Sequence, residues 1–255
     1  MTAPATVPDV HPLFSRGGAV GTWVSAADPT IAEVLAGSGV DFLAIDGEHG
    51  VVDVGSLGAV LAAVRPYGIP TLFRVAENEQ ARIQHALDSG AGGVIVPRVR
   101  SAADAARAAA ASLYPPDGTR GIAPRRASAY GRDPGYLGRA NATVSCVVQI
   151  ETREALDDLA AILRAPGVDA LLVGPNDLAA SLGHTGEIDD AEVLAAIDRV
   201  RAAATAAGVP IGIHVRTGTE ARSRLSEGFA FTTVSTDVGF LAAATDAMVR
   251  EARRA

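Results

Sequence analysis

The sequence predicts a single α/β domain that folds as a closed (β/α)8 barrel, the TIM-barrel architecture. Eight short apolar runs, rich in β-branched residues, alternate with stretches of helical composition along the 255 residues. Most of these runs follow one another at intervals of about 20–30 residues, which is the length that a parallel βα unit requires. Several helical stretches also end in glycine just before the next run, as expected where a helix closes in a left-handed conformation.

The expected strands lie in the apolar runs, namely Ala19–Val24, Phe42–Asp46, Thr71–Val75, Gly93–Val99, Val144–Glu151, Ala170–Gly174, Pro210–Val215 and Phe231–Ser235. The expected helices lie between them, namely Thr30–Ala36, Ser56–Val64, Glu79–Asp88, Ser101–Leu113, Arg153–Leu163, Ala191–Ala207, Thr219–Glu227 and Phe240–Arg253. An open doubly wound sheet is the structural alternative, but no G-x-G-x-x-G motif follows the first strand. Residues 1–13, with three prolines, are expected to form a frayed arm before a barrel domain of residues 14–255.

The composition is that of a globular chain with a sizeable core, at 48% hydrophobic and 20% charged residues. The formal net charge of −7 disfavours nucleic acid and anionic membrane surfaces as partners. No apolar run reaches the ~18–20 residues that a membrane helix requires, and the first 12 residues lack a signal-peptide pattern. The single cysteine, Cys146, cannot form an internal disulfide. We therefore expect a cytoplasmic protein.

All 22 basic residues are arginine, and the sequence contains no lysine. A Schiff-base aldolase, an internal pyridoxal-phosphate aldimine and a Walker-type phosphate loop each need a lysine amine. The sequence therefore excludes these three kinds of site. Any carbonyl chemistry in this protein has to use a metal ion or hydrogen bonds instead.

Polar residues gather where the expected strands end, which is where TIM barrels carry their active sites. They are Asp46–His49, Arg74, Gln149 and Glu151, Gly174–Asp177, and His214–Arg216. Several also have a purely structural explanation: His49 could cap a loop, Arg74 could pair with Asp46 or Glu48, and Asp177 could cap a short helix. Their common position at one rim is better explained by a functional site.

Glu151 and Asp177 are the natural metal ligands among these residues, because they are carboxylates from neighbouring strand ends. Such a set of oxygen donors suits Mg²⁺ or Mn²⁺, whereas zinc usually takes histidine or thiolate ligands. His49 is the imidazole that follows the early strands and is the candidate general base. Arg74 is the candidate stabiliser of a developing oxyanion.

Four segments resemble the HpcH/HpaI aldolase family: Ile45–His49, Tyr114–Gly121, Val148–Glu154 and Val173–Leu178. They occur in the family's order, and the resemblance extends from about Phe14 to Ala244. It implies a phosphoenolpyruvate/pyruvate-type barrel and a class II aldolase, dependent on Mg²⁺, Mn²⁺ or Co²⁺. Such an enzyme reversibly cleaves a 4-hydroxy-2-oxo acid, a small 2-keto acid, to pyruvate and an aldehyde.

The resemblance also assigns roles to individual residues. His49 matches the family's catalytic base, Arg74 its enolate-stabilising arginine, and Glu151 and Asp177 its metal ligands. The positions that match substrate-binding residues are Gln149, Gly174, Asn176 and Asp177. The segments that differ are the loop after Gly121, Arg98, and the ends of the last two strands, with His214, Arg216, Ser235 and Thr236. These differences leave the identity of the aldehyde open.

Asp88 matches the family's acid that raises the basicity of the catalytic histidine. It ends a predicted helix, however, and so belongs at the opposite end of the barrel from His49 of the same chain. We therefore expect Asp88 to reach a neighbouring subunit's site, with a solvent-exposed carboxylate as the alternative. The family resemblance implies a homo-oligomer, a hexamer built as a trimer of dimers, and the long Tyr114–Tyr136 connection is typical of a lid or a subunit contact.

Three other functions remain possible on this evidence. A citrate-lyase-like or malyl-coenzyme-A-type lyase would use the same barrel, but we would expect a longer C-terminal region or basic residues for the nucleotide. An isomerase of a phosphorylated sugar would use Ser235–Gly239 as a phosphate cradle. A barrel without activity could serve as an oligomeric scaffold, although the set of His49, Arg74, Glu151 and Asp177 argues against this.

Overall fold

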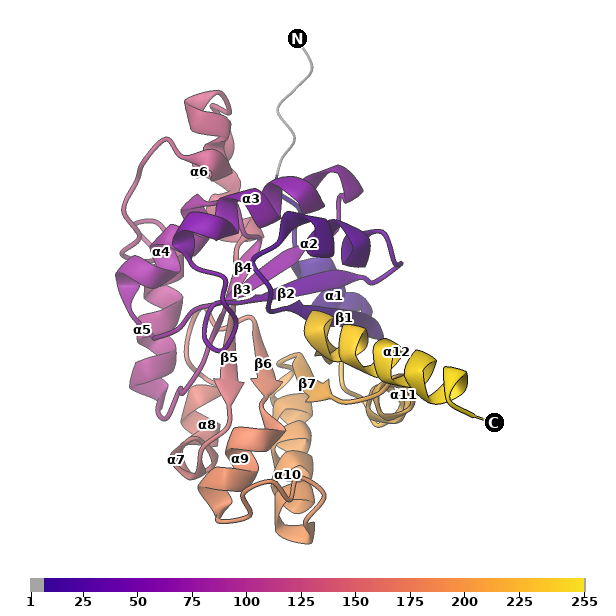
Figure 1. Cartoon of the computed structure of the whole chain (residues 1–255). Helices are drawn as coiled ribbons and strands as arrows, with labels where there is room; N and C mark the ends of the chain where they lie inside the picture. Colours follow the sequence, from indigo (N-terminus) through magenta and orange to yellow (C-terminus); the bar gives the residue numbers. More distant parts are fainter. Residues whose placement is uncertain (1–6, 255) are drawn as a thin grey trace.

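A computed structural model describes residues 7–254 and confirms the predicted barrel. Eight parallel strands close in chain order, with β8 paired to β1 (Figure 1). Their bounds are β1 Ala19–Val24, β2 Phe42–Asp46, β3 Thr71–Arg74, β4 Gly93–Val96, β5 Ser145–Ile150, β6 Ala170–Val173, β7 Ile211–Val215 and β8 Phe231–Thr236. Within the described residues, no helix has both the length and the apolar character to cross a membrane.

The helices between the strands also follow the predicted pattern. They are α2 Pro29–Ala36, α3 Val54–Val64, α4 Gln80–Asp88, α5 Ala102–Ser112, α7 Arg153–Asp157, α8 Leu159–Ile162, α10 Ala191–Ala207, α11 Gly218–Ser226 and α12 Asp237–Ala252. The helix expected over Arg153–Leu163 is divided at Asp158, whose carboxylate accepts a hydrogen bond from the backbone of Ala102 at the start of α5. A tertiary contact thus lies at the break in Arg153–Leu163, a segment whose sequence predicts one continuous helix.

Several short elements lie outside the strands and helices predicted from the sequence. They are α1 His11–Arg16, η1 Arg65–Tyr67, η2 Arg126–Gly131, α6 Tyr136–Thr143 and α9 Pro175–Leu182. Two of them, η2 and α6, belong to the long connection between β4 and β5. All of these elements are only about one or two turns long. Their apolar residues are therefore too few to show a helical period in the sequence.

The expected arm of residues 1–13 is partly ordered against the barrel. Residues 1–6 lie outside the described part, but α1 begins at His11, inside the proposed arm. Val10, Leu13 and Phe14 are buried at the amino-terminal end of the barrel. Their spacing of three and four residues places them on one helical face, and this face closes the bottom of the barrel.

Aromatic rings fill the inside of the barrel beneath the site. Phe42 and Phe231 lie edge to face with centroids 5.9 Å apart, and Phe14 lies 5.1 Å from Phe231. Gly212 on β7 makes room for them, since a Cβ at this position would lie 2.2 Å from the Phe231 ring. A second apolar layer separates the strands from the surrounding helices.

We expect Gly212→Ala to lower the free energy of unfolding by about 1–3 kcal/mol, because the added methyl group overpacks the barrel interior. Chemical denaturation followed by circular dichroism measures the change. Gly218→Ala is the matched control, since no atom lies within 4 Å of a Cβ placed there. Equal stability of the two variants would show that the Phe231 ring can move aside at little cost.

Candidate active site

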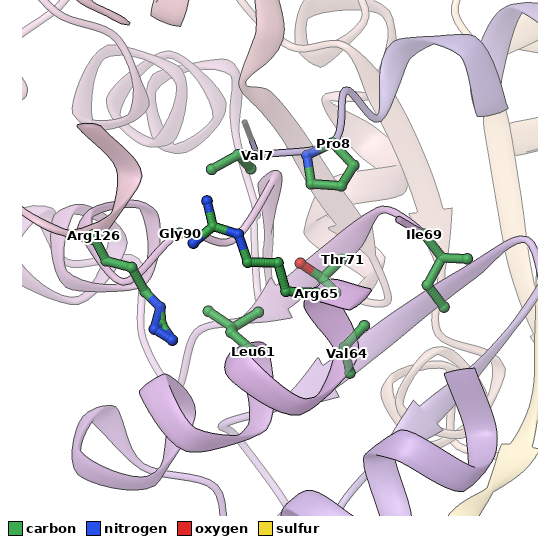
Figure 2. A pocket seen from close by; sticks show the side chains of 9 residues that line it. All are labelled: Val7, Pro8, Leu61, Val64, Arg65, Ile69, Thr71, Gly90 and Arg126. Atoms are coloured by element: carbon green, nitrogen blue, oxygen red, sulfur yellow. The ribbon is translucent and has the colours of Figure 1, made fainter. Parts of the chain in front are cut away.

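A cavity of about 130 Å³ opens at the carboxyl ends of the strands, where the sequence predicts the site. Six of the eight predicted site residues line it: His49, Arg74, Gln149, Gly174, Asn176 and Asp177. The remaining lining residues are Trp23, Asp46, Leu172, Val173, Pro175, His214 and Thr236. A smaller hollow of about 30 Å³ lies at the other end of the barrel, between Arg65 and Arg126, and holds none of the predicted site residues (Figure 2).

Arg74 is held in the rim by two carboxylates from β2 and the loop after it. Its Nε and Nη2 donate to the two oxygens of Asp46 over 2.9 and 2.8 Å, and its Nη1 lies 3.2 Å from Glu48. Asp46 and Arg74 are register partners on adjacent strands, so the sheet itself aligns this fork. Burial acts to raise the pKa of Asp46, but the hydrogen bonds and charge of Arg74 keep that pKa below its usual value. The pair is therefore ionised.

Trp23 supports the same guanidinium from a third direction. The Arg74 guanidinium carbon lies 4.4 Å from the centroid of the indole ring, a favourable cation–π arrangement. The indole Nε1 in turn donates a hydrogen bond to His214 Nδ1 over 3.1 Å. Neither Trp23 nor this contact is marked by a motif in the sequence; the one available signal is the position of Trp23 near the end of the first strand.

Glu151 lies behind Gly174 and is only 2% exposed. Its Oε1 accepts a hydrogen bond from the backbone N–H of Arg98 over 2.7 Å, and its Oε2 accepts one from the Gln149 amide. A Cβ at position 174 would lie 2.7 Å from both Glu151 and Gln149, so only glycine allows the chain to pass this close. These contacts fix the Glu151 carboxylate in one orientation.

The surroundings of Glu151 disfavour its charge. Burial raises the pKa of Glu151, and the nearby carboxylates of Asp177 and Glu48 raise it further. Asp177 lies in the first turn of α9, at the edge of the cavity. Gln149 Oε1 is also buried without a hydrogen-bond partner within the described chain. Clustered carboxylates and an unpaired amide oxygen are the donor types that a hard divalent cation prefers.

His49 lies at the outer edge of the cavity, and its side chain is 57% exposed. Its backbone N–H donates to Asp46 over 3.2 Å, and its Nε2 lies 3.8 Å from Glu48. The loop that carries the imidazole is therefore tied to the same carboxylate that holds Arg74.

Asp88 lies apart from this cavity, as its position at the end of α4 suggested. It is buried and accepts a hydrogen bond over 2.7 Å from Arg120 Nη2, which comes from the long connection after α5. The guanidinium of Arg120 is fully buried, 4.4 Å from the Tyr114 ring centroid. The structure thus brings Asp88 together with Arg120 and not with His49 of the same chain. Nothing in the sequence pattern indicated this ion pair.

A second group of possible metal ligands lies outside the cavity. His184, Glu187 and Asp190 place ligand atoms within 4.8 Å of one another in the loop between α9 and α10. His184 Nε2 already lies 3.0 Å from Glu192, and Glu187 is largely exposed. This group is a set of surface hydrogen bonds around a helix start.

Comparison with known proteins identifies the family of this chain. The sequence model of the HpcH/HpaI aldolase/citrate lyase family matches residues 19–244. The chain is 40% identical over 230 residues to 2-dehydro-3,6-dideoxy-6-sulfogluconate aldolase from Pseudomonas putida, covering 90% of each protein. It is 39% identical over 231 residues to 4-hydroxy-2-oxo-heptane-1,7-dioate aldolase from Salmonella heidelberg, covering 90% of this chain and 88% of the relative.

A crystal structure shows the same relationship in three dimensions. An HpcH/HpaI aldolase/citrate lyase family protein from Burkholderia cenocepacia superposes with a TM-score of 0.91 at 38% identity, covering 95% of this chain and 98% of the other. The family match spans the whole barrel from β1 into α12. The chain belongs to the HpcH/HpaI aldolase/citrate lyase family.

Proposed function

We propose that this cavity cleaves the C3–C4 bond of a 4-hydroxy-2-oxo acid to pyruvate and an aldehyde, and that the reaction depends on a divalent cation. The observation that carries the proposal is that the buried Arg74 fork and the Asp177 carboxylate line one cavity of a lysine-free chain, with the Glu151 carboxylate against its lining residues Gln149 and Gly174. An enolate could not form here through a lysine Schiff base, so its charge has to be stabilised by cations.

Glu151 and Asp177 would hold the cation, with Mg²⁺, Mn²⁺ and Co²⁺ as candidates. Burial raises the pKa of Glu151 and the nearby charge of Asp177 raises it further, and a cation between the two carboxylates would relieve this repulsion. When bound, a divalent cation would polarise the keto group of the substrate and offset negative charge on the enolate. Gln149 supports the proposal because its amide fixes one oxygen of Glu151.

The chain's own residues would carry the proton and charge transfers. His49 takes the proton of the 4-hydroxyl group, and the electron pair of the C3–C4 bond moves into a pyruvate enolate as the aldehyde forms. Arg74 uses three of its five N–H donors on Asp46 and Glu48, which leaves two for the enolate oxygen. The backbone from Gly174 to Asn176 would receive the pyruvate carboxylate. Protonation of the enolate at C3 then releases pyruvate.

A screen of pyruvate with a panel of aldehydes tests this function directly. Products are read by mass spectrometry with chelator alone and with added Mg²⁺, Mn²⁺ or Co²⁺. We expect new 4-hydroxy-2-oxo acids only where metal is present. Condensation or cleavage that requires a coenzyme A thioester would instead identify a malyl-coenzyme-A-type lyase.

We further propose that the protein works as a homo-oligomer, a hexamer built as a trimer of dimers, in the cytoplasm. Support comes from α12, which exposes the large apolar side chains of Val238, Phe240, Leu241 and Met248 and lies at the edge of the molecule (Figure 1). Apolar surface of this extent on one helix is typical of a subunit contact. Asp88 lines an open surface hollow next to Tyr130, where a neighbouring subunit's His49 could reach it.

We expect Glu151→Gln or Asp177→Asn alone to abolish metal-dependent aldol activity, and the double variant to be scarcely worse. The two carboxylates share the task of holding one ion, so loss of either removes it. Melting temperature measured with Mn²⁺ and with chelator should rise with metal in the wild type but not in these variants. Glu187→Gln, in the surface cluster, is the control that keeps both responses. A metal-dependent shift that survives in Asp177→Asn would place the ion elsewhere.

Arg74→Lys is expected to slow exchange of the pyruvate C3 protons by about 10²–10³-fold. A lysine ammonium cannot bind Asp46 and Glu48 and still present two aligned donors to an enolate. Exchange is followed by NMR in D₂O with saturating Mn²⁺ or Mg²⁺, and Arg107→Lys on the exposed face of α5 is the control. Near-normal exchange in Arg74→Lys would restrict Arg74 to a structural role.

Mixed oligomers test the shared site. His49→Ala and Asp88→Asn are each expected to lose most activity, but their co-expression should restore part of it. A mixed oligomer contains sites in which an intact His49 faces an intact Asp88 of the neighbouring subunit. Activity no higher than the sum of the two variants, in oligomers shown by light scattering to be mixed, would contradict action across subunits.

A further inference from the structure

We propose that Arg120 is a positioning residue for the reaction: it holds one oxygen of the Asp88 carboxylate, so that the other oxygen faces His49 of a neighbouring subunit. The inference rests on the proposed aldolase function and on the shared site described with it. It gives a role to Tyr114–Gly121, the family-like segment from which no residue lines the cavity.

The segment Tyr114–Gly121 folds back over the end of α5 and carries Arg120 to the end of α4. The backbone N–H of Arg120 donates to the carbonyl of Leu113 over 2.9 Å. A Cβ at position 118 would lie 2.3 Å from the same carbonyl, so this close return of the chain needs glycine. Since α4 and α5 lie side by side (Figure 1), the return places Arg120 next to Asp88, the last residue of α4.

Arg120 is fully buried, yet only part of its guanidinium is paired. Nη2 donates to Asp88 Oδ1 over 2.7 Å and lies 3.4 Å from Tyr136 Oη, while the guanidinium carbon lies over the Tyr114 ring. Nε and Nη1 are buried without a hydrogen-bond partner among residues 7–254. A buried ion pair with unpaired donors is a poor source of stability, because desolvation of the charges can cost more than their attraction returns. The fixed position of Asp88 is therefore a better explanation of this pair than stability.

The second oxygen of Asp88 is left for another partner. Within the described residues, Asp88 accepts a hydrogen bond at Oδ1 alone. Oδ2 is not among the buried side-chain atoms that lack a partner, so it reaches the surface. There Asp88 lines an open hollow of about 610 Å³ whose other titratable lining residues are His85, Arg125, Arg126 and Tyr130. Asp88 is thus the one carboxylate among the described residues of this hollow, and an imidazole N–H that enters it meets a single charged acceptor.

A fixed carboxylate matters because it sets the geometry of the histidine. Asp88 Oδ2 accepts the proton of one ring nitrogen of the neighbouring subunit's His49, and the other nitrogen is then directed at the 4-hydroxyl group of the substrate. A misplacement of about 1 Å in such an arrangement can cost about 10²-fold in rate. Arg120 acts through Asp88, since neither residue lines the cavity.

The test is a double-mutant cycle with Arg120→Met and Asp88→Asn. It is read as kcat for addition of pyruvate to the fastest aldehyde of the screen, at saturating Mn²⁺. We expect Arg120→Met to lower kcat by roughly 10–100-fold in the otherwise unchanged chain and to have almost no further effect in Asp88→Asn. The KM for pyruvate should be the same in all four proteins, because the pair lies outside the cavity.

Arg120→Lys takes the same place in the cycle and decides the question if Arg120→Met does not fold. Its ammonium can still donate to Asp88 but lacks the planar fork over Tyr114, so its kcat should lie between those of the wild type and Arg120→Met. Arg139→Met is the matched control, because Arg139 belongs to the same connection but pairs with Asp133. It should keep the wild-type kcat.

Three results would overturn the inference. An equal fall in kcat in both backgrounds would show that Arg120 supports the connection or the oligomer and does not act through Asp88. Wild-type kcat in every folded Arg120 variant would show that Asp88 needs no support. Wild-type kcat in Asp88→Asn would remove both residues from the reaction and leave the metal-dependent aldol activity intact. A wild type that adds pyruvate to no aldehyde would instead overturn the aldolase function itself.

Discussion

The buried ion pair between Asp46 and Arg74 is the interaction on which the whole rim depends. Asp46 accepts hydrogen bonds from Nε and Nη2 of the guanidinium and from the backbone N–H groups of Glu48 and His49. One carboxylate thus positions the candidate enolate stabiliser and the loop of the candidate base together. Removing one partner of such a pair leaves an uncompensated buried charge, at a cost of about 3–5 kcal/mol. The hydrogen bonds between Asp46 on β2 and Arg74 on β3 offset the free-energy cost of removing both charged groups from water.

The excess of negative charge around the cavity indicates a second role for the proposed cation. Asp46 and Asp177 line the cavity, Glu48 and Glu151 contact residues that line it, and Arg74 is the buried guanidinium paired with Asp46 and Glu48. A keto acid is itself an anion and would be repelled by this excess of carboxylates. A divalent cation held by Glu151 and Asp177 would therefore contribute to substrate binding as well as to enolate stabilisation. Both effects would be lost together in the ligand variants.

The two halves of the rim differ in how they are built. The half proposed to bind pyruvate is closely constrained, with Gly174 packed against Gln149 and Glu151 and with Arg74 fixed on several sides. The half near His214 adjoins a second hollow lined by apolar residues such as Ile188 and Ile213 and by the charged residues Asp189, Arg216, Glu220 and Arg224. Such a division allows the reactive groups to stay fixed while the size and polarity of the second substrate vary.

The sequence by itself determined the barrel and excluded a lysine Schiff base, and six of the eight site residues predicted from it line the cavity. The residues at the strand ends could be predicted to form a site because repeated βα units place the carboxyl ends of all strands at the same end of the barrel. Only the tertiary structure decided the contacts that are distant in the chain: Trp23 with Arg74 and His214, Asp88 with Arg120, and Val10 and Leu13 beneath the barrel. These depend on how side chains of separate strands and loops meet, which local apolar spacing does not encode.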